Sequence, residues 1–139
     1  MFSGKASPTQ AYQRVSIETS LESANPHKLV VLLFEGAMTA VVTAKNHLRE
    51  KHIAEKGMAV SKAIDIILNG LRASLNQEAG GELAERLAAL YDYMSDRLLF
   101  ANLNNDPAVL DEVLGLLSTL HSAWVEIGDK DHTADAGSN

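Results

Sequence analysis

The sequence predicts an all-α protein, an antiparallel up-down four-helix bundle with a short N-terminal helical arm. Three observations lead to this fold class: two helix-start signals of the same kind, apolar residues at helical spacing in four segments, and no strand alternation over more than a few residues. The chain has 139 residues, of which 46% are hydrophobic and 22% charged, so it can form one domain with its own core. Short connections between the four segments favour antiparallel neighbours.

The first and last helices of the bundle begin at a polar residue followed by proline, at Asn25-Pro26 and at Asp106-Pro107. The side-chain oxygen can accept a hydrogen bond from an otherwise unpaired amide, and proline is well tolerated at the first helical position. About twenty residues without proline follow each signal. They predict helices over 26–51 and 107–128.

Two weaker breaks divide the chain between these helices. Glu55-Lys56-Gly57 interrupts the apolar pattern, and Ala79-Gly80-Gly81 is a firmer stop because glycine adopts the left-handed conformation at low cost. They predict helices over 58–78 and 82–104. The predicted core stripe of the latter consists of Leu83, Leu87, Leu90, Met94, Leu98 and Ala101, which share one helical face.

The two ends of the chain fall outside the bundle of residues 26–128. Residues 1–25 carry Tyr12, Val15, Ile17 and Leu21 at spacings that allow a short amphipathic helix, which would be marginal alone. We therefore expect an arm that docks on the bundle. Residues 129–139 are polar and acidic and are expected to be a disordered tail.

Charge and hydropathy argue against nucleic-acid and membrane roles. Residues 1–77 carry a balance of +3 and residues 78–139 a balance of -9, which gives the net charge of -6. No basic face is concentrated enough to neutralise a phosphate backbone, and the acidic half would repel anionic lipid. The longest purely apolar run, 29–34, is too short for stable membrane insertion, and no secretory signal is visible. We expect a cytoplasmic location.

No pattern typical of an enzyme appears. There is no cysteine, no phosphate-binding loop and no nucleophile elbow, so we expect no catalytic residue and no cofactor. His47 and His52 are five residues apart, on different faces of a continuous helix, and no Glu-x-x-His occurs. We therefore expect no metal site, and the rival interpretation, a carboxylate-metal bundle, is disfavoured. His121 is expected to bond to a carbonyl or hydroxyl group.

Apolar residues outside the core stripes are the candidates for binding. Tyr93 and Phe100 share one face, and Leu99 and Leu103 project further round among acidic residues. The alternative is that the two aromatic side chains only seal the edge of the bundle. A stripe of mostly small residues on the second helix could leave a trough for another helix, or could simply allow close packing inside the bundle: Ala59, Ala63, Ile66, Gly70 and Ala73.

The order of several motifs resembles the FliS-type flagellin export chaperones. The family typically has a Leu-Tyr-x-Tyr-Met stretch, then Arg-Leu and an Ala-Asn pair, and this chain has Leu90-Tyr91-Asp92-Tyr93-Met94, Arg97-Leu98 and Ala101-Asn102, followed by Trp124. An N-terminal tyrosine, Tyr12, and Asn25-Pro26-His27-Lys28-Leu29 leading to Phe34-Glu35-Gly36 match as well. Phe34 stands where tyrosine is common, and Asn25 where serine is frequent. The resemblance covers about residues 10–127.

This resemblance implies a cytoplasmic chaperone that binds the disordered C-terminal segment of flagellin, blocks premature filament polymerisation and delivers flagellin to the flagellar type III export apparatus. The implied partners are flagellin and a component of the export gate. The alternative is a helical-bundle scaffold or a chaperone for a different secreted subunit.

In the family the tyrosine-bearing arm can occupy part of the client surface until displaced. A docking arm can also swap into a second copy, so a homodimer is compatible with this arrangement. Together with the surface features above, these considerations give the expected partner-binding residues: Tyr12, Val15, Ile17, Phe34, Ile66, Gly70, Tyr93, Leu99, Phe100 and Leu103.

Overall fold

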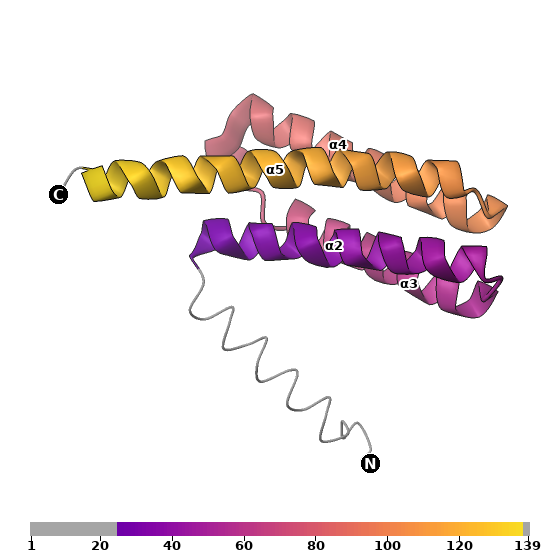
Figure 1. The fold of residues 1–139 in the computed structure, drawn as a ribbon. Coiled ribbons are helices and arrows are strands. Elements are labelled where there is room, and N and C mark those ends of the chain that lie inside the picture. Colours follow the sequence, from indigo (N-terminus) through magenta and orange to yellow (C-terminus); the bar gives the residue numbers. More distant parts are fainter. Residues whose placement is uncertain (1–24, 138–139) are drawn as a thin grey trace, which may run out of the picture.

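The computed structural model describes residues 25–137 and confirms the all-α four-helix fold. The elements in chain order are α2 (Pro26–Arg49), α3 (Ile53–Asp65), which continues into the π-helical η1 (Ile66–Arg72), α4 (Gln77–Asn104) and α5 (Pro107–Gly137). Helices α2 and α5 lie side by side, and α3 and α4 form the other layer (Figure 1). Within residues 25–137 there is no strand.

The two predicted helix starts are confirmed together with their caps. Asn25 Oδ1 accepts a hydrogen bond from the Lys28 amide at 2.7 Å, and Asp106 Oδ1 accepts one from the Ala108 amide at 3.0 Å. Proline occupies the first position of both helices, where no intrahelical partner for an amide hydrogen would exist. The local sequence therefore sets where α2 and α5 begin.

The break between the first two helices is not where the sequence pattern predicted it. The chain turns at Glu50–His52, with Lys51 in the left-handed region at φ 64°, and Gly57 lies inside α3. The His52 amide donates to the His47 carbonyl at 2.8 Å, which closes the turn. A lysine in this conformation carries no glycine signal, so the pattern pointed to the nearest glycine instead.

The break at Gly80-Gly81 is confirmed as a sharp kink. Gly81 has φ 54° and ψ -130°, a conformation that side chains disfavour, and α4 changes direction there. The predicted core stripe is wrong at Leu83, which is 63% exposed in the first turn after the kink. Ala84 and Ala88 are buried in its place, because their small side chains let α4 approach its neighbours closely.

The core runs the length of the bundle and centres on α2. Phe34 is 1% exposed, and its ring lies 6.4 Å from that of Tyr91 on α4 and 6.5 Å from that of Trp124 on α5. The largest fully buried side chains in the described part of the chain are Phe34, Ile67, Leu71, Met94, Leu98, Leu110 and Leu117. Helix α5 continues to Gly137, past the predicted end at residue 128.

Helix α2 is, by length and composition, the one described helix that could cross a membrane. In the bundle it packs between α3 and α5 and against η1. Five of its residues are buried there: Phe34, Ala37, Ala40, Val41 and Ala44. These buried residues account for part of its apolar character, and Val42 adds exposed apolar surface.

Candidate partner-binding surfaces

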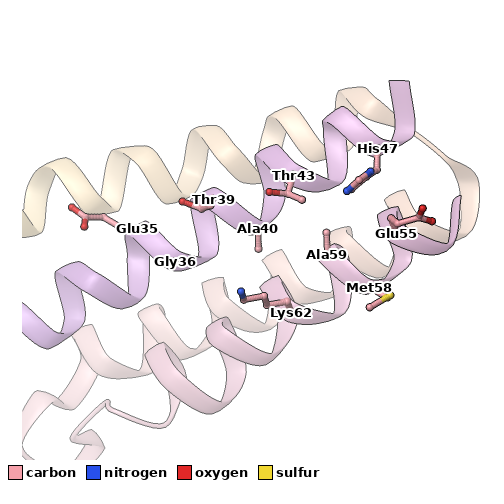
Figure 2. Close-up of a pocket in the computed structure, with 10 residues that line it drawn as sticks. All are labelled: Glu35, Gly36, Thr39, Ala40, Thr43, His47, Glu55, Met58, Ala59 and Lys62. Atoms are coloured by element: carbon pink, nitrogen blue, oxygen red, sulfur yellow. The ribbon is translucent and has the colours of Figure 1, made fainter. Parts of the chain in front are cut away.

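A groove of about 500 Å³ runs between α2 and α3 (Figure 2). We call it the α2–α3 groove. Its lining is Glu35, Gly36, Thr39, Ala40, Thr43 and His47 from α2, and Glu55, Met58, Ala59 and Lys62 from α3. The floor is small and apolar, Glu35 and Glu55 lie toward opposite ends, and Lys62 lies opposite Ala40, so the groove combines an apolar floor with charged groups on its walls.

Small residues create this groove. Gly36, Ala40 and Ala59 form its floor, and their short side chains leave the depression above them open. Beside it α2 and η1 approach closely at Gly70, where a Cβ atom would lie 3.0 Å from the Leu33 side chain, whereas one at Gly36 would lie at an ordinary contact distance, 3.4 Å, from Ile66 Cδ1. Close approach at one end and small side chains in the middle together make an open trough.

A second hollow of about 480 Å³ lies on the other side of α2, against α5. It is lined by Met38, Thr39, Val42, Thr43, Leu114 and Ser118. Thr39 and Thr43 border both hollows, so the exposed side of α2 forms a ridge between two depressions. Val42 on this ridge is exposed, which adds apolar surface.

Large apolar side chains gather on the outer side of α4. Tyr93 is 44% exposed, Leu99 50%, Phe100 44% and Leu103 81%. We call these four residues the α4 patch. Their exposure confirms that all four side chains are on the surface, outside the core stripe of α4.

Polar contacts with α5 brace the aromatic side of the α4 patch. The Tyr93 hydroxyl donates to Glu112, and Arg97 Nε donates to Glu112 Oε1 at 2.9 Å. The Arg97 guanidinium lies 5.1 Å from the centre of the Phe100 ring. The hydrogen bond from Tyr93 lowers the pKa of Glu112 most, and the bond from Arg97 lowers it further. The bond between Tyr93 and Glu112 also raises the pKa of Tyr93. These contacts hold Tyr93 and Phe100 in fixed positions although both are exposed.

Three of the expected partner-binding residues belong to the packing of the bundle instead. Phe34 is in the core, Gly70 packs against Leu33, and Ile66 is half-buried beside Gly36. Within the small-residue stripe, Ala63, Ile66 and Gly70 pack inside the bundle, Ala59 also lines the α2–α3 groove, and Ala73 is exposed. Tyr12, Val15 and Ile17 lie outside the described residues.

The histidines make contacts that the sequence pattern did not predict. His121 Nε2 bonds to the Glu35 carboxylate at 3.0 Å, rather than to a carbonyl or hydroxyl group. His27 bonds to the Trp124 carbonyl oxygen and stacks on its ring. His47 and His52 come together across the turn, contrary to the expectation of different faces. Among the described residues no group of three or more potential metal ligands is present.

The groove residues Thr39, Thr43 and Met58 were missed in the sequence. The signal that could have revealed them is the pairing of small residues on two successive helices, Gly36 and Ala40 with Ala59. A threonine or methionine beside such a pair borders a depression, whereas the same residue beside large side chains would lie on a filled surface.

Comparison with known proteins shows similarity to flagellar FliS proteins along most of the chain. The profile of the flagellar protein FliS family matches residues 8–131. The chain is 51% identical over 125 residues to a flagellar secretion chaperone FliS from Salmonella typhimurium, covering 90% of this chain and 93% of that protein. It is 44% identical over 121 residues to the Escherichia coli flagellar secretion chaperone FliS, covering 87% and 89%. The flagellar secretion chaperone FliSB of Pseudomonas aeruginosa is 47% identical over 113 residues, covering 81% and 89%.

Proposed function

The chain belongs to the FliS family of flagellar secretion chaperones, and on that premise we propose that it binds the C-terminal segment of flagellin in the cytoplasm. It keeps flagellin from polymerising and delivers it to a component of the flagellar type III export gate. An export-chaperone role follows from the family. The identity of the client and the place of delivery are the proposal.

The observation that supports this client best is the pairing of two unlike apolar surfaces on one small bundle. The α2–α3 groove is concave with a floor of small residues, and the α4 patch presents large exposed side chains. A segment that is disordered until bound can follow both surfaces, because it folds to the shape that it meets. A helix fits the groove, and an apolar stretch fits the patch.

Charged side chains at the groove favour one register of a bound helix. Glu35 and Lys62 lie on opposite walls, with His47 and Glu55 nearer the turn (Figure 2). A client helix that places polar groups along the walls and small or apolar groups over Ala40 would satisfy both the floor and the walls. The groove therefore selects an amphipathic segment rather than any apolar peptide.

The proposed mechanism is steric. Covering the C-terminal segment removes the surface through which flagellin subunits assemble and keeps that segment from folding on its own. Binding a disordered segment costs ordering free energy, so a large buried surface is compatible with release. The mechanism needs no nucleotide and no catalytic group.

We assign the N-terminal segment a role as a competitor for part of this surface. Tyr12, Val15 and Ile17 supply apolar side chains that the client would displace. This assignment rests on the family resemblance and the spacing of these residues.

Calorimetric titration of the full-length protein with a peptide of the flagellin C-terminal segment tests the proposal. We expect saturable one-to-one binding with a negative heat-capacity change and a gain of helical circular dichroism signal. A variant that lacks residues 1–20 serves as the second arm and should bind more tightly. If neither form binds the soluble peptide, the flagellin assignment is wrong. The protein would then be a helical-bundle scaffold or a chaperone for a different secreted subunit.

A further inference from the structure

We propose that His47 and His52 form a binding site for a transition-metal dication of the Zn²⁺, Ni²⁺ or Cu²⁺ class, with water in the remaining coordination positions. The site joins the last turn of α2 to the residue before α3. This inference is independent of the proposed flagellin client.

The separation of the two rings matches what such a cation requires. His47 Nδ1 and His52 Nδ1 are 3.4 Å apart, and the ring centres are 5.5 Å apart with 46° between the ring planes. Two nitrogen ligands at about 2.1 Å from a tetrahedral metal lie roughly 3.4 Å from each other. The bound cation replaces the single hydrogen that the two nitrogens now share.

The backbone holds both residues in place before any cation binds. Lys51 adopts φ 64°, and the His52 amide donates to the His47 carbonyl at 2.8 Å. The His52 carbonyl accepts from the Lys56 amide at 2.9 Å as α3 begins. A turn fixed at both ends lowers the cost of bringing two ligands together.

The chemistry of the ligands selects the class of cation. Neutral imidazole favours zinc, nickel and copper, whereas magnesium and calcium prefer oxygen ligands. The described residues contain no group of three or more potential protein ligands, so the site supplies two. Both side chains are accessible to solvent, which leaves room for water ligands and for entry of the ion.

The site also borders the α2–α3 groove. His47 is one of the residues that line the groove, at the end nearest the turn (Figure 2). A cation there would link α2 to α3 and fix the His47 ring at the end of the groove.

The test is titration of the full-length, tag-free protein with NiCl₂ and with ZnSO₄, followed by calorimetry and by NMR of the imidazole protons. We expect one saturable site, with the shifts largest at His47 and His52. His47→Gln and His52→Gln should each weaken binding by more than about tenfold, since each removes one of two ligands. His52 makes no side-chain cap bond, so its replacement should leave the fold intact, as circular dichroism would verify.

His121→Gln is the matched control, because that histidine pairs with a carboxylate elsewhere on α2. It should leave the affinity unchanged. Undiminished binding in both turn variants, or no saturable binding by roughly 1 mM cation, would overturn the proposal.

Discussion

The α2–α3 groove and the α4 patch present apolar surface in opposite ways. In the groove the surface is concave, because Gly36, Ala40 and Ala59 are too small to fill the space between two helices. In the patch large side chains stand out from α4, and contacts to Glu112 on α5 hold the aromatic ones. The groove depends on small side chains, and the patch depends on large exposed ones.

This difference gives the two surfaces opposite responses to substitution. A larger side chain fills the groove but changes the α4 patch little. A smaller side chain removes apolar surface from the patch but only widens the groove. Both surfaces depend on the same core, so a core substitution should affect them together.

The largest effect is expected for Phe34→Ala, which removes the ring that contacts both Tyr91 and Trp124. The free energy of unfolding should fall by about 3–5 kcal/mol, as for other large-to-small substitutions of buried aromatic residues. Urea unfolding followed by circular dichroism measures it. Unchanged stability with lost client binding would instead place Phe34 at the client interface.

A large side chain in the groove should come next. Thr43→Trp fills the hollow from an exposed position on α2 and should weaken binding of the flagellin segment by more than about tenfold, or 1.4 kcal/mol. Its free energy of unfolding should stay within about 0.5 kcal/mol of the wild type. Ser61→Trp places the same ring on an exposed position of α3 outside the groove and should bind normally. Equal affinity for both variants would exclude the groove as a client site.

Truncation in the patch should have a smaller effect on affinity. Phe100→Ala removes an exposed ring and should cost about 1 kcal/mol of binding, since only a minority of interface residues cost more than this when truncated, with little change in the unfolding midpoint. Ile53→Ala is the control, because Ile53 is 49% exposed at the start of α3, away from both surfaces. A large loss of stability for Phe100→Ala would mean that the ring seals the bundle.

The smallest effect is expected for Tyr93→Phe, which removes the hydroxyl that contributes most to the lowered pKa of Glu112. The pKa of Glu112 should rise toward the ordinary value of a glutamate carboxyl, 4.5, as NMR titration of its carboxyl carbon would show. Because the folded-state pKa is depressed, Glu112 stabilises the fold above its unfolded pKa, and this contribution disappears as the pH falls through the folded pKa. An unchanged Glu112 pKa in the variant would mean that Arg97 alone sets it.

Much of the fold could be predicted because its signals are local. Asn25-Pro26 and Asp106-Pro107 each carry a cap and a proline, and both helix starts are where these residues place them. Gly81 likewise marks its own kink. The turn at Lys51 could not be predicted in this way, because nothing in the residue type signals its left-handed conformation.

The surfaces were only partly predictable because they depend on which helices meet. Spacing alone placed Tyr93 and Phe100 on one face outside the core stripe, and Leu99 and Leu103 further round, and all four are exposed. It could not show that Gly70 packs against Leu33, or that Phe34 faces α4 and α5. It also could not place His47 beside His52, which required the turn between them.

In the proposed complex one disordered segment contacts the α2–α3 groove and the α4 patch at once. Amide chemical-shift mapping of the ¹⁵N-labelled protein, titrated with the flagellin C-terminal segment, tests it most directly. We expect the shifts in the groove and on α4 to saturate together at one equivalent. The groove residues are Thr39, Thr43 and Met58, and the α4 residues are Leu99, Phe100 and Leu103. Saturable binding with shifts confined to one surface, or to neither, would contradict it.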